Sequence, residues 1–188
     1  MVEEKLVLGV AGMPGSGKSL VVKVALENGY DVVVMGDVVR REAERKSLEA
    51  NPENIGKTML ELREKEGKSV IARRCLPKIE EAKRHKVVVD GIRSLREVEE
   101  FKKRFPKFSL IAVCSSPETR FQRLYRRRRS DDADGWDVFH GRDMRELSVG
   151  LGDAIAMAEY TVVNDEALDV VRNRIKRVLR RMEGKWRT

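Results

Sequence analysis

Short runs of apolar residues recur along the chain, and longer segments with a helical spacing of apolar positions lie between them. Such nearly continuous apolar runs are typical of strands that are buried on both faces of a parallel sheet. Strands that alternate with helices predict an α/β fold, in which right-handed crossovers place helices on both faces of the sheet. We therefore expect a doubly wound, five-stranded parallel sheet, with strands at 6–11, 31–35, 87–90, 110–114 and 160–163.

Helices are predicted between and after these strands. Asn51 and Pro52 have the character of a helix N-cap followed by a first-turn proline, and Pro77 is expected to kink or restart a helix. The predicted helices cover 18–27, 38–46, 55–66, 70–84, 95–104, 117–128, 139–159 and 166–182.

Two regions depart from simple alternation of strands and helices. Several helices stand between the second and third strands, so the region from about 37 to 85 is interpreted as a helical insertion on the acceptor side of the site. The polar stretch at about 128–141 is rich in Asp and Gly and is interpreted as a lid. With 188 residues, the chain fits a single domain that spans 1–188.

The chain lacks the sequence features of membrane-spanning and exported proteins. No stretch approaches the roughly 20 uninterrupted apolar residues that a membrane-spanning helix needs, and the N-terminal segment lacks the regions of a signal peptide. Cys75 and Cys114 lie far apart, and His85 and His140 are the only histidines, so neither a disulfide framework nor a zinc site is indicated. We expect a cytoplasmic protein without a membrane partner.

One motif carries specific chemistry. The segment 12–19 fits the pattern G-x-x-x-x-G-K-[ST] and lies between a predicted buried strand and a predicted helix, which is the context that a P-loop requires. Glycines let successive backbone N–H groups turn toward phosphate oxygens, and the helix adds the positive end of its dipole. The motif predicts that ATP or GTP binds to Gly12, Met13, Pro14, Gly15, Ser16, Gly17, Lys18 and Ser19.

Lys18, Ser19 and Asp90 are assigned to the triphosphate and its metal ion. Lys18 can reach the β- and γ-phosphate oxygens and is interpreted as catalytic, and the hydroxyl of Ser19 suits Mg²⁺. Asp90 ends a predicted strand, so its carboxylate is expected at the carboxyl edge of the sheet, where ligands of such folds bind. The alternative for Asp90 is a cap on the helix that follows, and we favour the metal role.

Asp37, Arg40 and Arg41 follow the second strand and form a candidate acceptor site. Asp37 can accept hydrogen bonds, and either arginine can hold an anion through two parallel hydrogen bonds. An alcohol acceptor would benefit from a carboxylate base, for which Asp37 is the candidate. The alternative is that Asp37 caps a helix whose arginines are solvated.

Arginines are also concentrated around the predicted lid. Arg123 and Arg127 lie on one face of the helix that starts at 117, together with Arg120, while Arg142 and Arg145 follow the lid. Arginines that close over a transferring phosphoryl group stabilise the charge that spreads over its oxygens. The alternative is a set of surface salt bridges.

The aromatic residues of the lid admit two interpretations. Trp136 and Phe139 can stack on a nucleotide base or anchor the lid to the core, and we favour anchoring.

With these residues in hand, nearly the whole chain resembles the P-loop kinases of small molecules, the group that contains adenylate, cytidylate and dephospho-CoA kinases. Gly36-Asp37-x-x-Arg40 is similar to the segment with which adenylate kinases hold the acceptor nucleotide. Asp37 with Arg41 instead resembles the dephospho-CoA kinase segment in which the aspartate lies near the acceptor hydroxyl. Both alternatives stay open, and together they imply that Asp37, Arg40 and Arg41 bind the acceptor.

Other segments extend this resemblance. Arg123-Leu124-x-x-Arg127 is similar to the start of the lid in these kinases, and Asn164 ends a stretch that resembles the loop beside the adenine. The resemblance implies that Arg123 and Asn164 bind the nucleotide and that Arg127 and Arg142 take part in catalysis. Arg93 is assigned to the acceptor, although 90–93 is one residue shorter than the corresponding adenylate kinase segment.

The overall likeness is to an archaeal family of nucleotide-kinase-like proteins. That family is recognisable here by 89–94, by 129–132 and by 142–150. Its acceptor is not established, so the likeness supports the fold more than the substrate.

The positive net charge of the chain is compatible with a second function. The chain has 39 Lys and Arg against 31 Asp and Glu, a net charge of +8, which attracts polyanions. The basic run 126–129 is followed at once by Asp131 and Asp132, so no long basic face is indicated. We therefore favour an ATP- or GTP-dependent kinase acting on a nucleoside monophosphate or a dephospho-CoA-like nucleotide. The alternative is a P-loop NTPase or switch that acts with nucleic acid, and a third interpretation is nucleotide binding without turnover.

Overall fold

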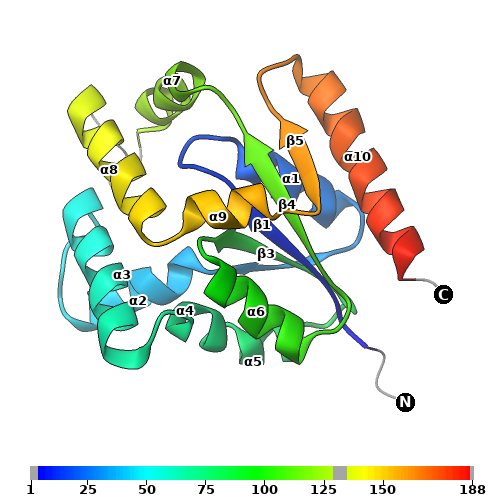
Figure 1. The fold of residues 1–188 in the computed structure, drawn as a ribbon, viewed down its shortest axis with the longest axis horizontal. Helices are drawn as coiled ribbons and strands as arrows, with labels where there is room; N and C mark the ends of the chain where they lie inside the picture. The colour runs from blue at the N-terminus through cyan, green and yellow to red at the C-terminus, as the bar shows by residue number, and fades with distance from the viewer. Residues whose placement is uncertain (1–3, 129–134, 187–188) are drawn as a thin grey trace.

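The computed structural model describes residues 4–128 and 135–186, and its strands form one parallel sheet (Figure 1). The sheet order is β2-β3-β1-β4-β5, with parallel pairing throughout. The central strand is buried along its whole length, as its continuous apolar run predicts. This confirms the predicted five-stranded α/β fold. The strands are β1 (Leu6–Ala11), β2 (Asp31–Val34), β3 (Lys86–Ile92), β4 (Phe108–Cys114) and β5 (Tyr160–Val163).

Helices cover both faces of the sheet. The face that carries Leu8 and Val10 packs against α1 (Lys18–Glu27) and α10 (Leu168–Lys185). The opposite face carries Val7 and packs against a larger set of helices (Figure 1). Helices α7 (Pro117–Arg127) and α8 (Trp136–Ser148) pack against each other in a separate small cluster. The larger set is α2 (Gly36–Arg45), α3 (Pro52–Glu66), α4 (Val70–Arg73), α5 (Leu76–Glu80), α6 (Leu95–Arg104) and α9 (Leu151–Ala156).

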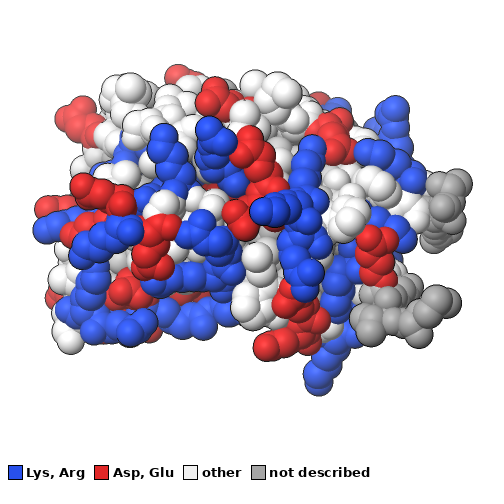
Figure 2. Space-filling model, turned by 60° about the horizontal axis from the view of Figure 1, so that its bottom comes forward, with Lys and Arg blue, Asp and Glu red and all other residues white. Residues whose placement is uncertain are grey.

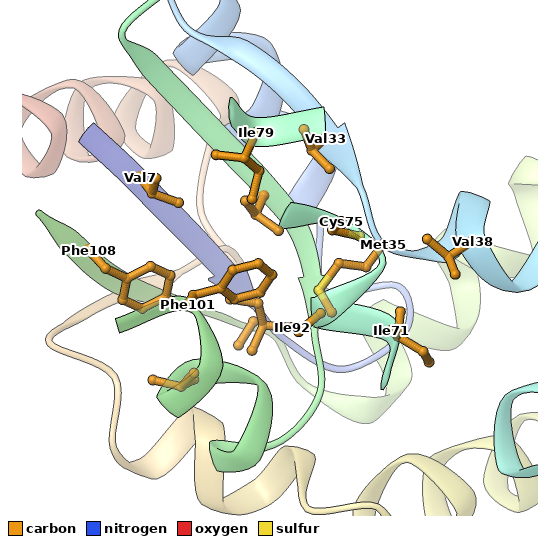
Figure 3. Close-up of a cluster of buried hydrophobic side chains, with 14 of the residues drawn as sticks. Val7, Val33, Met35, Val38, Ile71, Cys75, Ile79, Ile92, Phe101 and Phe108 are labelled. Carbon is orange, nitrogen blue, oxygen red and sulfur yellow. The ribbon is translucent and has the colours of Figure 1, made fainter. Parts of the chain in front are cut away.

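Figure 3 shows the larger of the two cores. Phe101 of α6 stacks on Phe108 of β4, with 5.9 Å between ring centroids. Cys75 is buried in this core as a free thiol, and burial raises its pKa to about 12. The same core includes side chains from each of α2 to α6 and holds these helices against the sheet. Helices α2 and α3 form one wall of the site described below.

Two predicted helices are each divided in the structure. The predicted helix 70–84 separates into α4 and α5, and Pro77 lies in the first turn of α5, as expected of a proline that restarts a helix. The predicted helix 139–159 separates into α8 and α9 because Gly150 turns the chain with a φ of 102°.

The region of the predicted lid is helical in part. Residues 129–134 lie outside the described residues, and α8 begins at Trp136, so 136–141 is helical. The role of this region as a lid stays a prediction. Phe139 is buried, and it packs with Phe121 and Trp136 at centroid distances of 5.2 to 5.6 Å. Phe139 forms a small cluster of its own with Phe121 and Leu124, so these contacts anchor the start of α8 to α7 rather than to the cores of the sheet.

A bulge at the carboxyl end of β3 shapes the site. Val10 of β1 pairs with Asp90, but Ala11 pairs with Ile92, so Gly91 is an extra residue in β3 with a φ of 100°. Val89 and Ile92 therefore lie in the same core although they are three positions apart. The bulge lets β3 continue beyond Asp90, where the sequence pattern alone ends the strand.

Candidate functional site

The segment 12–19 connects β1 to α1, as the motif requires, and its glycines are enforced by packing. Gly15 has a φ of 79°, and a Cβ there would lie 2.5 Å from the carbonyl oxygen of Arg120. Gly17 has a φ of 92°, and a Cβ there would collide with the side-chain amide of Asn164. The loop is thus closely supported from behind by two other segments of the chain.

Lys18 lies at the start of α1, and charged side chains surround it. Its Nζ donates hydrogen bonds to the carbonyl oxygens of Gly12 at 2.7 Å and Met13 at 3.2 Å. Burial lowers the pKa of Lys18 to about 8, against the opposing influence of the Asp90 and Glu146 carboxylates. The guanidinium groups of Arg93 and Arg142 lower that pKa further, so these side chains converge on one place.

Asp90 occupies the position expected of a metal partner. Its Oδ1 is buried and accepts no hydrogen bond from the described residues. The alternative role as a helix cap is not observed, because Ser94 caps α6 by accepting a hydrogen bond from the backbone N–H of Glu97. A buried carboxylate oxygen that accepts no hydrogen bond from the described residues fits a hard cation such as Mg²⁺. Ser19 lies in the first turn of α1 and is not among the residues that line the cleft described below, so its role as a metal ligand stays a prediction.

Arg123 and Asn164 contact the P-loop rather than the cleft in front of it. Asn164 donates from Nδ2 to the carbonyl oxygen of Ser16 at 2.8 Å. Arg123 donates to the carbonyl oxygen of Asn164 at 2.6 Å and to the hydroxyl of Ser115 at 2.8 Å. The two residues therefore hold the loop in place, and their direct contact with a nucleotide stays a prediction.

Arg120 and Asp143 form a buried ion pair that the sequence did not reveal. The guanidinium of Arg120 donates to both carboxylate oxygens of Asp143, at 2.9 and 2.6 Å, and to the carbonyl oxygen of Pro14 at 3.1 Å. It also lies 4.9 Å from the centroid of the Phe139 ring. The pair joins α7, α8 and the P-loop, whereas helical spacing had grouped Arg120 with the lid arginines.

An arginine-rich cleft lies in front of the P-loop, between α2 and α3 on one side and α8 on the other. The side chain of Arg145 reaches from α8 across this cleft to α3. Its guanidinium packs against Gly56 and donates to the carbonyl oxygen of Pro52 at 3.1 Å. The structure thus brings the predicted Lys18, Asp90 and several arginines together. The cleft is lined by Pro14, Gly15, Lys18, Val34, Gly36, Val39, Arg40, Pro52, Ile55, Gly56, Met59, Asp90, Gly91, Arg93, Arg127, Arg142, Arg145 and Glu146.

Asp37 and Arg41 are not among the residues that line this cleft. Asp37 forms an ion pair with Arg40 at 2.6 Å, and Arg41 is exposed and donates from Nε to the backbone carbonyl oxygen of Asp37. Arg40 does line the cleft. Of the three predicted acceptor ligands beside the second strand, the structure thus places one in the cleft.

Glu146 is a cleft residue that sequence reasoning missed. Its side chain is 6% exposed, and its Oε1 forms an ion pair with Arg93 at 2.9 Å. Its Oε2 is buried and accepts no hydrogen bond from the described residues. Glu146 lies four residues after Arg142, so helical spacing put both on one face of α8 and was the available signal.

Within the described residues, no helix is long and apolar enough to cross a membrane.

Comparison with known proteins places the chain among P-loop proteins. Residues 11–140 match the family model described as an AAA domain. A UPF0200 protein of Methanocaldococcus jannaschii is 47% identical over 176 residues, which cover 93% of this chain and 89% of that protein. A UPF0200 protein of Hyperthermus butylicus is 45% identical over 180 residues, which cover 96% of each.

Solved structures resemble this chain in fold. A structure from Thermus thermophilus has a TM-score of 0.65 and 17% identity, over 95% of this chain and 98% of that chain. The shikimate kinase of Acinetobacter baumannii, in complex with shikimate, has a TM-score of 0.61 and 15% identity, over 99% of this chain and 97% of that chain. The fold is therefore that of the P-loop kinases.

Proposed function

The chain belongs to the UPF0200 family of archaeal proteins and carries an AAA domain, and we propose that it is a kinase that uses ATP or GTP with Mg²⁺. It transfers the γ-phosphoryl group to a small acceptor, a nucleoside monophosphate or a dephospho-CoA-like nucleotide. A kinase-like nucleotide-binding function is supported by the family and by the fold. The transfer itself and its acceptor are the proposal.

A single observation carries this proposal: the P-loop opens onto a cleft lined by arginines from several different elements. Arg40 comes from α2, Arg93 from the segment after β3, Arg127 from α7, and Arg142 and Arg145 from α8. A nucleotide switch needs to hold the triphosphate, but it does not need a second anion site beside it. A kinase needs both, and separate arginines around one cleft are suited to two anions.

Each group has a role in this scheme. The backbone N–H groups of the P-loop and Lys18 hold the phosphates, and Ser19 and Asp90 hold Mg²⁺, which supplies neutralising charge when it is bound. Arg127 and Arg142 stabilise the transferring group, and Arg40 and Arg93 hold the acceptor. The chain contributes by positioning two reactants and by compensating charge.

The alternative, an NTPase that acts with nucleic acid, requires a continuous basic surface. Figure 2 shows a face on which Lys and Arg side chains are interspersed with Asp and Glu side chains. Among the described residues, basic side chains are often paired with acidic ones, as in the ion pairs Lys46–Glu61, Arg74–Glu66 and Arg104–Glu80. This pattern favours the kinase.

The test is phosphoryl transfer from ATP and from GTP, with Mg²⁺, to a panel of nucleoside monophosphates and small alcohols that includes dephospho-CoA. Transfer to one acceptor should far exceed hydrolysis without acceptor, and Lys18→Ala should lower it by at least about 100-fold. Lys23→Ala, on the same helix but outside the cleft lining, is the matched control. Hydrolysis that does not respond to any acceptor would refute the kinase and favour the switch.

A further inference from the structure

One oxygen of the buried Glu146 carboxylate has no hydrogen-bond partner among the described residues. Glu146 is buried, and its Oε1 is held by Arg93, while its Oε2 accepts no hydrogen bond from the described residues. Buried ionised oxygens without a donor are costly and rare in folded proteins. Because no described residue donates to Oε2, a molecule bound in the cleft can supply the donor there.

Glu146 lies beside Lys18 of the P-loop. Glu146 lines both the arginine-rich cleft and an adjoining recess of about 50 Å³, which Lys18 and Arg142 also line. The carboxylate is close enough to the Lys18 ammonium to influence its pKa. A donor seated at Oε2 is therefore beside the lysine that holds the phosphates.

The helix that carries Glu146 is fixed on both sides. Asp143, one turn earlier in α8, forms the buried ion pair with Arg120. Arg145 anchors α8 to the carbonyl oxygen of Pro52 on α3. Glu146 is thus held in place before any substrate arrives, as a group that must orient a reacting atom should be.

The chemistry of the acceptor follows from what can donate to Oε2. A phosphate acceptor is largely deprotonated at neutral pH, because its second pKa is about 6, and it offers few protons to a carboxylate. A hydroxyl always offers one. We propose that Glu146 accepts the hydrogen of an acceptor hydroxyl, so that the acceptor is an alcohol and not the phosphate of a nucleoside monophosphate. This inference rests on the proposed kinase function and narrows its substrate class.

The other residues that line the cleft indicate which further groups the acceptor carries. Arg40 and Arg145 bring guanidinium groups that match a carboxylate or phosphate on the same molecule. Val39, Ile55 and Met59 supply a small apolar wall. Among the described residues that line the cleft, none has an aromatic ring, so the cleft provides no aromatic platform for a base. A compact hydroxy acid or a phosphorylated alcohol fits these walls.

The transfer step is balanced without any further reagent. The hydroxyl oxygen forms a bond to the γ-phosphorus as the bond from that phosphorus to the β–γ bridging oxygen breaks. The electron pair leaves with the nucleoside diphosphate, and the hydroxyl proton passes to Oε2 of Glu146. The product is a phosphate monoester, and Glu146 loses the proton to solvent after the product leaves.

The experiment compares two classes of acceptor with the full chain and the Glu146→Gln variant. The alcohols are D-glycerate and shikimate, whose anionic group is a carboxylate, and glycerol 3-phosphate and dephospho-CoA, whose anionic group is a phosphate. The phosphate acceptors are AMP, CMP, GMP and UMP. Phosphorus NMR of the product distinguishes a monoester from a phosphoanhydride. Calorimetry measures acceptor binding to each variant independently of turnover.

We expect transfer to an alcohol, a monoester product and a kcat about 10²- to 10³-fold lower in Glu146→Gln. The KM for ATP should stay within about 3-fold, because Glu146 acts on the acceptor, and the variant should bind the alcohol about 10-fold more weakly. Glu183→Gln is the matched control, because Glu183 is also a largely buried, ion-paired carboxylate, bonded to Lys86 at the opposite end of β3. It should keep the wild-type rate.

The outcomes separate this inference from the proposed function. Transfer to nucleoside monophosphates alone, with a phosphoanhydride product, overturns the inference and leaves the kinase standing. Full activity of Glu146→Gln toward an alcohol overturns the role of Glu146. Lys18-independent hydrolysis with every acceptor overturns the kinase and the inference together.

Discussion

Replacing Asp143 with alanine should destabilise the protein, because it leaves the guanidinium of Arg120 buried without its main partner. The two side chains are 6% and 11% exposed and share two hydrogen bonds, at 2.9 and 2.6 Å. Arg120 also donates to the carbonyl oxygen of Pro14 in the P-loop. The perturbation therefore tests whether this buried pair supports the nucleotide site.

The expected magnitude follows from the burial of the pair. Removing one partner of a buried ion pair costs about 3–5 kcal/mol. Arg120 keeps its contacts with Pro14 and with the Phe139 ring, so we expect the lower part of that range, about 3–4 kcal/mol. For a chain of this length, that loss lowers Tm by about 6–16 °C. Replacing both residues, with Arg120→Met and Asp143→Leu, removes the charges together and should cost less than Asp143→Ala alone.

The assay is urea unfolding of the wild type, Asp143→Ala, Arg120→Met, Asp143→Leu and the double variant. The wild type and the last three variants form a double-mutant cycle. The coupling energy should reach at least about 2 kcal/mol. Glu99→Ala is the control, because Glu99 forms an ion pair with Arg96 in which both side chains are more than 60% exposed, and it should cost under about 1 kcal/mol. A loss below about 1 kcal/mol for Asp143→Ala, or a double variant less stable than Asp143→Ala, would refute the reasoning.

Two further predictions concern the P-loop. Because the pKa of Lys18 is lowered to about 8, its ammonium is lost as the pH rises through that value, and a bound phosphate favours the charged form. Calorimetry with MgADP should therefore give a Kd that is constant below about pH 8 and rises toward tenfold per pH unit above it, and a flat profile up to pH 9.5 would count against this role. Gly17→Ala should cost about 1–2 kcal/mol of stability and weaken MgADP binding by at least about tenfold, because alanine is strained at a φ of 92° and would collide with Asn164. Gly141→Ala on α8, where a Cβ meets open space, should leave binding unchanged, and an equal loss in both variants would contradict the packing argument.

The parts of the candidate site that the structure brings together as expected are those set by local pattern. A buried strand, a P-loop and a helix occur in direct succession, and Asp90 follows three valines, so the edge of the sheet on which it lies is fixed by the parallel topology. Arg93, Arg127 and Arg142 are brought to the same cleft as Lys18. Their roles in phosphoryl transfer stay predictions.

The acceptor side was less accessible to sequence reasoning. Asp37 and Arg41 matched a familiar spacing, but the orientation of α2 leaves them outside the cleft lining and brings Arg40 into it. Spacing along a helix fixes which residues share a face, but it does not fix which way that face points in the tertiary structure.

The sequence by itself determined the parallel sheet, the order of its elements and the phosphate-binding loop, because these depend on the apolar period and on backbone conformations that few residues can adopt. Only the tertiary structure decided which charges meet. Arg120 and Asp143 are 23 residues apart, and Glu146 and Arg93 come from different segments of the chain. They pair in the folded protein because a buried charge without a partner is costly. Only the tertiary structure shows that Oε2 of Glu146 accepts no hydrogen bond from the described residues, and the class of acceptor is inferred from this feature.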